Sequence, residues 1–170
     1  YYNLENDRPL IFLDADELVQ IPGDKKTIFI NPKGTAYSQD NSEVIYKAQK
    51  GILDDNFGLL KLEKDVSLKT VDTLLLSDYG IYYMNEAKAF AEGNVKTKKH
   101  NFANGDTIFV NSREAISHFS TRKSSYIGDV NGHIKRKKVY EENVYFKSQI
   151  LDFDEIAQFI ELRDDVYIKK

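Results

Sequence analysis

The residues that could carry chemistry in this sequence do not form a catalytic or metal-binding pattern. The chain has three histidines, His100, His118 and His133. None has the H-x-x-x-H or H-E-x-x-H spacing that brings two imidazoles onto one metal ion, so we expect them on exposed loops or strands. Asp14, Asp16 and Glu17 lie close together but lack the calcium-loop pattern, and no serine lies in a G-x-S-x-G turn. The sequence therefore predicts a protein that is not an enzyme and holds no metal ion or cofactor.

Two short basic runs, residues 96–100 and 134–138, are the clearest charged features. The pattern favours a solubilising edge or loop, and the alternative is a contact with phosphates or sugar acids near the mouth of a groove. Nucleic acid is not predicted as a partner, because the net charge is −3 and no aromatic platform accompanies the runs. The stretch Gly128-Asp-Val-Asn-Gly132 is not a phosphate loop, because neither Lys-Ser/Thr nor a helix signal follows it.

The composition favours strands over helices. The 170 residues fit a single domain, 1–170, and the apolar content depends on 11 Tyr and 10 Phe, which suit a pleated sheet. The chain has no cysteine, which excludes disulfides and thiolate sites, and no apolar run of the length that spans a bilayer. Because the chain begins at Tyr1 and not at Met, a leader or a membrane anchor could precede it.

Alternation of apolar and polar residues recurs in three units of 27 residues, 44–70, 73–99 and 144–170. In each unit two alternating runs flank a polar turn, which is typical of repeated supersecondary structure. In the second unit, residues 88–99 break at Gly93-Asn94 and resume at Val95, a hairpin or bulge signal. Residues 100–143 hold a looser version of the same pattern.

The third unit also admits a helix. Residues 154–165 have apolar positions spaced as on one helix face, with acidic residues where a helix would begin. The first unit has Asp55-Asn56-Phe57-Gly58 at the matching place, which is a turn and a poor helix. The repeat therefore favours strand in the third unit as well.

The segment before the first unit predicts short strands. Residues 9–21 indicate one or two strands and residues 27–30 another, with turns at Pro22-Gly23-Asp24 and Gln39-Asp40-Asn41. Residues 1–8 are polar, and we expect them to be loose.

The alternation predicts one apolar and one polar face on an antiparallel sheet of about 14–16 strands. The residues expected on the inward face are Leu60, Leu62, Val66, Leu68, Leu75, Tyr79, Ala91, Val95, Phe109, Phe146, Ile150, Ile160, Leu162, Val166 and Ile168. Ala89 and Ala91 are the smallest inward residues of the three units, so we expect the most interior space beside them. Core residues and lipid-lining residues are of the same types, and the pattern alone favours a plain sandwich core over a roll whose seam admits lipid tails.

Residues 91–95, Ala-Glu-Gly-Asn-Val, resemble the A-x-G-N-V signature of OstA-like proteins, the LptA and LptC components of lipopolysaccharide export. The order of residues 48–54 and 60–66 is also similar to this family, and Ile30-Asn31-Pro32 resembles LptC more than LptA. Lys64-Asp65 and Asp164-Asp165 stand where the family prefers Gly-Asn, so the sequence does not predict the same bulge there.

This resemblance implies a twisted antiparallel β-jellyroll, open along one side, whose hydrophobic groove cradles the acyl chains of lipid A. The inward residues given above would then bind lipopolysaccharide. The resemblance also implies a protein without enzymatic activity that stands in the periplasm on an N-terminal inner-membrane helix absent from this chain. Its implied partners are an LptA-like jellyroll protein and the inner-membrane lipopolysaccharide transporter.

The end of the chain predicts a partner-binding edge. Its residues are Asp165, Val166, Tyr167 and Ile168. A terminal strand there would have unpaired backbone groups that another jellyroll protein, or a second copy of this chain, would satisfy by strand addition. The alternative function is a ligand-free structural or adhesive extracytoplasmic β-domain. A carbohydrate-active enzyme ranks last, because no carboxylate pair can be named.

Overall fold

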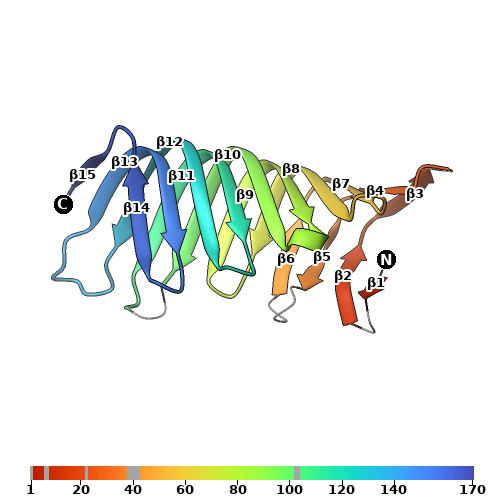
Figure 1. Ribbon diagram of the computed structural model, residues 1–170, viewed down its shortest axis with the longest axis horizontal. Helices are drawn as coiled ribbons and strands as arrows, with labels where there is room; N and C mark the ends of the chain where they lie inside the picture. Colours follow the sequence, from red (N-terminus) through yellow and green to blue (C-terminus); the bar gives the residue numbers. More distant parts are fainter. Residues whose placement is uncertain (1, 6–7, 22, 38–42, 102–103) are drawn as a thin grey trace.

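The computed structural model describes residues 2–5, 8–21, 23–37, 43–101 and 104–170. In this part of the chain, fifteen antiparallel strands form one sheet, together with one 3-10 turn, η1 (Met84–Glu86) (Figure 1). The strands are β1 (Tyr2–Glu5), β2 (Arg8–Asp14), β3 (Glu17–Ile21), β4 (Lys26–Ile30), β5 (Lys33–Tyr37), β6 (Glu43–Lys47), β7 (Lys50–Asp54), β8 (Leu59–Lys69), β9 (Thr73–Tyr83), β10 (Lys88–His100), β11 (Thr107–His118), β12 (Lys123–Lys135), β13 (Val144–Asp154), β14 (Phe159–Arg163) and β15 (Tyr167–Lys169). The predicted all-β antiparallel fold is confirmed.

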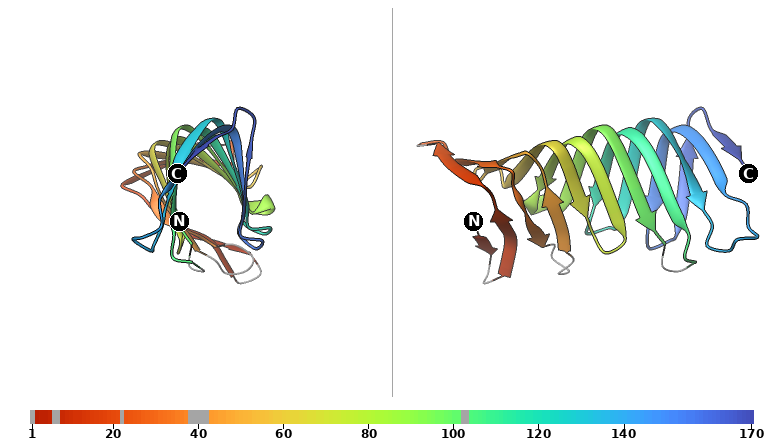
Figure 2. Two further views of the ribbon diagram at one scale, coloured as in Figure 1. Left: turned by 90° about the vertical axis from the view of Figure 1, so that its left-hand side faces the viewer. Right: turned by 180° about the vertical axis from the view of Figure 1, so that it is seen from behind.

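The sheet rolls up without closing. Its main path is β1-β2-β5-β6-β8-β9-β10-β11-β12-β13-β14, while β3, β4 and β7 branch at the N-terminal end and β15 pairs with β13. Viewed along the long axis, the strands curve around a common axis and form two walls (Figure 2). Among the described residues the path does not return from β14 to β1, so the fold is an open jellyroll and not a closed barrel.

The sheet bends at four copies of one motif, two consecutive residues with positive φ followed by a valine. The copies are Lys64-Asp65-Val66, Gly93-Asn94-Val95, Gly128-Asp129-Val130 and Asp164-Asp165-Val166. The strand register shifts at the first three of them, as at a β-bulge. The bulge predicted at Gly93-Asn94 is therefore confirmed. The same conformation at Lys64-Asp65 and Asp164-Asp165 was not expected from the sequence.

Hydrogen bonds from neighbouring segments of the chain explain how a corner forms without glycine. A left-handed residue other than glycine costs roughly 1–2 kcal/mol. At the first corner, the backbone N–H of Gln49 donates to the carbonyl oxygen of Lys64 (3.0 Å), and the Gln49 side chain donates to the Asp65 carboxylate. At the last corner, the backbone N–H of Gln149 donates to the carbonyl oxygen of Asp164 (2.9 Å). These hydrogen bonds partly offset the cost of the left-handed backbone.

On the strands between these corners, a buried serine marks the bend. The hydroxyls of Ser77, Ser112 and Ser148 each donate to the carbonyl oxygen two residues further on, at 3.0, 2.8 and 2.9 Å. Beyond the serine the alternation resets, so the next buried residue lies three positions along and not two. On β9, for example, Leu75 and Ser77 are buried and the next buried residue is Gly80.

Three of the inward residues expected from the sequence lie on the outer face, two of them because of this reset. Tyr79 and Ile150 follow Ser77 and Ser148 by two positions and therefore lie on the outer face. Tyr79 is paired there with Glu63 and Glu92, whose charges add to burial, the larger cause, in raising its pKa. Phe109 stacks on the His133 ring at 4.6 Å on the outer face, while both of its chain neighbours are buried. Three successive apolar residues at 108–110 hide the alternation there.

The interior is filled by two adjoining clusters of buried side chains. The N-terminal cluster includes Phe29 and Tyr46, whose hydroxyl donates to the carbonyl oxygen of Phe12 at 2.9 Å. The C-terminal cluster includes Val95 and Phe146, and Leu68 packs against both clusters. One apolar interior therefore runs along the jellyroll.

The start of the chain and the end of the third repeated unit both form strands. The segment at residues 1–8 was expected to be loose, and this is wrong, because residues 2–5 form β1 and pair with β2. Strand is confirmed over helix in the third unit, where a turn at residues 155–158 leads into β14. The turn expected at residues 39–41 lies outside the described residues. No helix in the described part of the chain is long and apolar enough to cross a membrane.

Candidate functional site

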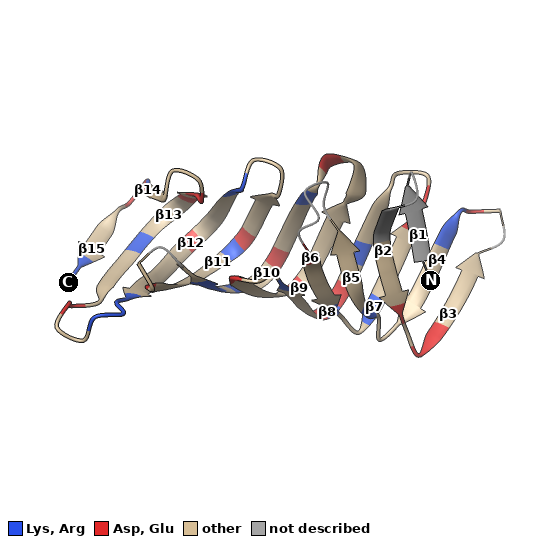
Figure 3. Ribbon diagram, turned by 90° about the horizontal axis from the view of Figure 1, so that it is seen from below, with Lys and Arg blue, Asp and Glu red and all other residues tan. Residues whose placement is uncertain are grey.

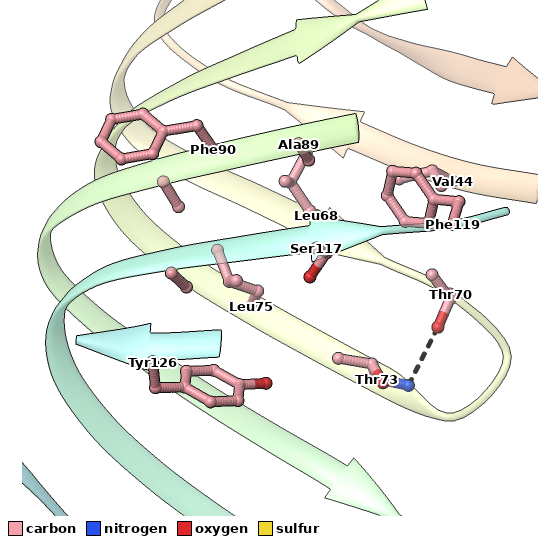
Figure 4. Close-up of a pocket in the computed structure, with 12 residues that line it drawn as sticks. Val44, Leu68, Thr70, Thr73, Leu75, Ala89, Phe90, Ser117, Phe119 and Tyr126 are labelled. Carbon is pink, nitrogen blue, oxygen red and sulfur yellow. Dashed lines mark hydrogen bonds between the residues drawn. The ribbon is translucent and has the colours of Figure 1, made fainter. Parts of the chain in front are cut away.

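A small cavity lies inside the jellyroll, between its two walls. It measures about 40 Å³ and is lined by Val44, Leu68, Thr70, Thr73, Leu75, Ala89, Phe90, Ala91, Ala115, Ser117, Phe119 and Tyr126 (Figure 4). Most of these side chains are apolar, and burial raises the pKa of the Tyr126 hydroxyl to about 12, so the phenol is uncharged at neutral pH. The cavity can therefore take an apolar group.

Small residues on β10 and β11 line this space and belong to a row of small residues across the sheet. Across neighbouring strands, Gly80 on β9 pairs with Ala91 on β10, and Ala91 pairs with Ala115 on β11. The same row continues to Leu62 on one side and to Tyr126 on the other. Larger side chains thus flank three small ones. Ala89 and Ala91, beside which the sequence predicts the most interior space, both line the cavity.

The cavity opens toward a mouth between two rims. We define the first rim as the C-terminal ends of β8, β10 and β12 together with the residues that follow each of these strands. The second rim is defined in the same way by the C-terminal ends of β9, β11 and β13 and the residues that follow them. A second cavity of about 210 Å³, here called the vestibule, lies at this mouth. The vestibule and the inner cavity share the lining residues Thr70, Thr73, Ser117, Phe119 and Tyr126.

An ion cluster joins the two rims across the vestibule. Lys99 and Asp72 both belong to the first rim, and Lys99 Nζ lies 3.0 Å from Asp72 Oδ2. Lys99 Nζ also lies 2.7 Å from Oε1 of Glu155, which belongs to the second rim. Arg122 Nε, also on the second rim, lies 3.3 Å from Glu155 Oε2. The side chains of Lys99, Asp72 and Glu155 are only 10%, 17% and 20% exposed, so these ion pairs are partly shielded from solvent.

Asp72 is the more firmly held acid of the cluster. Burial alone would raise its pKa, but hydrogen bonds from Thr73, Lys99 and Thr70 and the charge of Lys99 together lower the pKa below its ordinary value. The Thr70 and Thr73 hydroxyls each donate to Asp72 Oδ1 at 2.8 Å. Asp72 is therefore ionised at neutral pH and fixes the position of Lys99.

The two basic runs have different roles. In the first run, Lys99 is buried in the vestibule whereas Lys96 and Lys98 are exposed. In the second run, Arg136 Nη1 lies 2.7 Å from Asp106 Oδ2. Burial would raise the pKa of Asp106, but the Lys137 backbone N–H and the Arg136 side chain lower it. The second run therefore stabilises the turn that carries Asp106. Figure 3 shows acidic and basic residues interspersed along the sheet.

The structure brings most of the expected inward residues into the interior. The buried ones are Leu60, Leu62, Val66, Leu75, Ala91, Val95 and Phe146. Leu68, Ile160 and Leu162 are partly buried against the core. Sequence reasoning missed Ala115, Tyr126, Val130, Leu151 and Phe153, which are also buried. The signal that could have found part of this set is Gly128-Asp129-Val130, which has the same form as Gly93-Asn94-Val95.

The end of the chain lies at an open edge. β15 pairs with β13, and no other strand of the described chain pairs with β14 or β15 (Figure 1). Val166, Tyr167 and Ile168 are 49%, 56% and 58% exposed, so Val166 and Ile168 do not line the interior as expected. This part of the expectation is corrected, because no other strand of the described chain covers the last corner. A backbone edge and an apolar surface are available together.

The described residues contain no group of three His, Asp or Glu side chains that could hold a metal ion. The acidic side chains near the start of the chain have other partners. Asp14 forms an ion pair with Lys33 (3.3 Å), and Asp16 accepts a hydrogen bond from Asn31 (2.8 Å).

One comparison with known proteins shows the family of this chain, and another shows its fold. A family model described as LptC, lipopolysaccharide-assembly, LptC-related, matches residues 3–120. The structure is similar to the crystal structure of LptH, described as the LptA homologous periplasmic component of the conserved lipopolysaccharide transport device from Pseudomonas aeruginosa. The TM-score is 0.64 at 12% identity, over 75% of this chain and 94% of that chain, a similarity that shows the fold. No curated protein sequence matches.

Proposed function

This chain belongs to the LptC-related family of lipopolysaccharide-assembly proteins, and from that premise we propose that it binds the acyl chains of lipopolysaccharide between the walls of its jellyroll. The observation that carries the proposal is the group of small residues Ala89, Ala91 and Ala115, which line a cavity inside an apolar interior. Each CH₂ group buried in such surroundings contributes about 0.8 kcal/mol. A lipid tail would therefore gain affinity there without polar contacts.

Loading a lipid requires the walls to part. The inner cavity of about 40 Å³ has room for roughly three water molecules and not for an acyl chain. The two rims would have to separate at the vestibule, where the side chains of Lys99 and Glu155 join them. We therefore propose that the lipid enters through the mouth and that the walls close around its tails.

Native mass spectrometry of the lipid-free protein mixed with purified lipopolysaccharide tests this proposal. We expect a mass increase of one lipopolysaccharide molecule that persists at low collision energy. The competing function is a ligand-free structural domain, which the nearly filled interior favours, since most inward side chains are buried. That function predicts the mass of the protein alone at every lipid concentration, and such a result would reject lipid binding.

We propose that the lipid then passes to a neighbouring jellyroll protein of the LptA type at the β14–β15 edge. Free edges accept an added strand through main-chain hydrogen bonds, and the exposed apolar residues of β15 would be buried by it. The same surface could pair with a second copy of this chain. We also propose that the protein lies in the periplasm, is anchored in the inner membrane and contacts the inner-membrane transporter. The description of LptH as a periplasmic component supports the periplasmic location.

A further inference from the structure

The ion cluster of the vestibule lies where the head of a bound lipid would be. The vestibule shares part of its lining with the inner cavity, so a molecule with its tail in the cavity would leave its polar end in the vestibule. The vestibule is more polar than the inner cavity and contains the hydroxyls of Thr70, Thr73, Ser117 and Ser124. It also contains the cations Lys99 and Arg122.

The two acids of the cluster are held differently. Asp72 accepts hydrogen bonds from two threonine hydroxyls in addition to Lys99, all on the first rim or its adjoining strands. Glu155 is held through its carboxylate by the two cations, and its backbone N–H donates to the carbonyl oxygen of Arg122 at 3.1 Å. Glu155 lies in the turn after β13, so its side chain can leave the cluster without moving a strand. Asp72 keeps Lys99 in place when that happens.

The geometry of Glu155 is that of an anion shared between two cations. Its Oε1 atom lies 2.7 Å from Lys99 Nζ, and its Oε2 atom lies 3.3 Å from Arg122 Nε. A phosphate group presents its oxygens in the same way and makes charge-assisted hydrogen bonds with both kinds of side chain. With Glu155 in place the cluster has two positive and two negative charges. Without it, one positive charge is in excess.

We propose that the vestibule binds the phosphate of a phosphorylated glycolipid, which replaces the Glu155 carboxylate on Lys99 and Arg122. This inference rests on the proposed function, because it assumes that the tail of the same lipid occupies the interior. The replacement separates Glu155 from Lys99, so the direct ion pair between the two rims is replaced by a contact through the phosphate. The bound headgroup then joins the two rims around the lipid tail.

The test compares the affinity of the protein for phosphorylated lipid A with its affinity for the same lipid after dephosphorylation. For the unchanged protein we expect the phosphorylated lipid to bind about tenfold more tightly than the dephosphorylated lipid, because one charge-assisted contact contributes a difference in affinity of this size. Glu155→Gln is expected to raise this ratio several-fold, because the competing carboxylate charge is gone. Arg122→Gln is expected to lower the ratio, and Lys99→Met to lower it further. Arg122 is 59% exposed, so Arg122→Gln is expected to fold. The affinity ratio can therefore be measured with this variant even if Lys99→Met does not fold.

The matched control is Glu63→Gln, which removes a carboxylate from an ion pair with Lys50 (3.2 Å) on the outer face and should leave the ratio unchanged. If Glu155→Gln raises both affinities equally, Glu155 only holds the mouth shut and the headgroup site is rejected. Equal binding of both lipids by the unchanged protein also rejects it while leaving tail binding intact. If neither lipid binds, the proposed function fails together with this inference.

Competition with inorganic phosphate tests whether the phosphate of the lipid itself occupies the vestibule. In excess, it is expected to weaken binding of the phosphorylated lipid and to leave binding of the dephosphorylated lipid unchanged. No effect on either lipid would contradict the proposal.

Discussion

Removal of residues 166–170 is expected to abolish binding to a jellyroll protein of the LptA type, with a rise in the dissociation constant of at least about 100-fold. The deletion removes β15, whose backbone edge has no strand partner in the described chain other than β13. It also removes the exposed apolar side chains of Val166, Tyr167 and Ile168. Titration calorimetry with a purified LptA-type protein measures the change.

The deletion should not unfold the rest of the protein. The removed side chains are about half exposed and do not belong to either buried cluster. The thermal midpoint should therefore stay within a few degrees of that of the full chain. Tyr167→Thr is the matched control, because it changes a side chain and keeps the strand backbone. Full affinity after the deletion would show that the partner does not bind at this edge.

Ala91→Leu is expected to reduce lipopolysaccharide binding about tenfold or more without unfolding the protein. Ala91 is 2% exposed and lines the inner cavity, so a larger side chain occupies the space that a lipid tail would take. Overpacking of this kind costs about 1–3 kcal/mol of stability, less when a cavity receives the new atoms. The measurement is lipid bound per protein after gel filtration, together with a thermal unfolding curve.

Ala157→Leu provides the control for this substitution. Ala157 is an exposed residue of the turn before β14, so the same change in size there should alter neither loading nor folding. Unchanged loading by a folded Ala91→Leu protein would mean that the lipid does not use this part of the interior.

The regular strands of the fold could be predicted from the sequence because their alternation is strict. In β8 and β10, Leu60, Leu62, Val66, Ala91 and Val95 all lie inside as expected. These strands keep the same alternation across their corners, since each inserts two left-handed residues.

The errors arise where the backbone departs from simple alternation. At Ser77 and Ser148 the alternation resets by one residue, which moves Tyr79 and Ile150 to the outer face. The corner at Lys64-Asp65 depends on hydrogen bonds from Gln49, a residue of the connection between β6 and β7, so no local pattern predicts it. The ion cluster depends on contacts between residues 56 positions apart. Such long-range pairs are not readable from a single sequence.

Photo-cross-linking from matched inward and outward positions tests most directly the central claim that lipid lies inside the jellyroll. Leu62, Val95, Phe146 and Leu162 point inward, and Lys61, Lys96, Lys147 and Glu161 are their outward neighbours. A photoreactive residue is placed at each position in turn, and the protein is irradiated with lipopolysaccharide. We predict lipid adducts from the inward positions and little or none from the outward ones. Adducts from the outward positions alone would contradict the account.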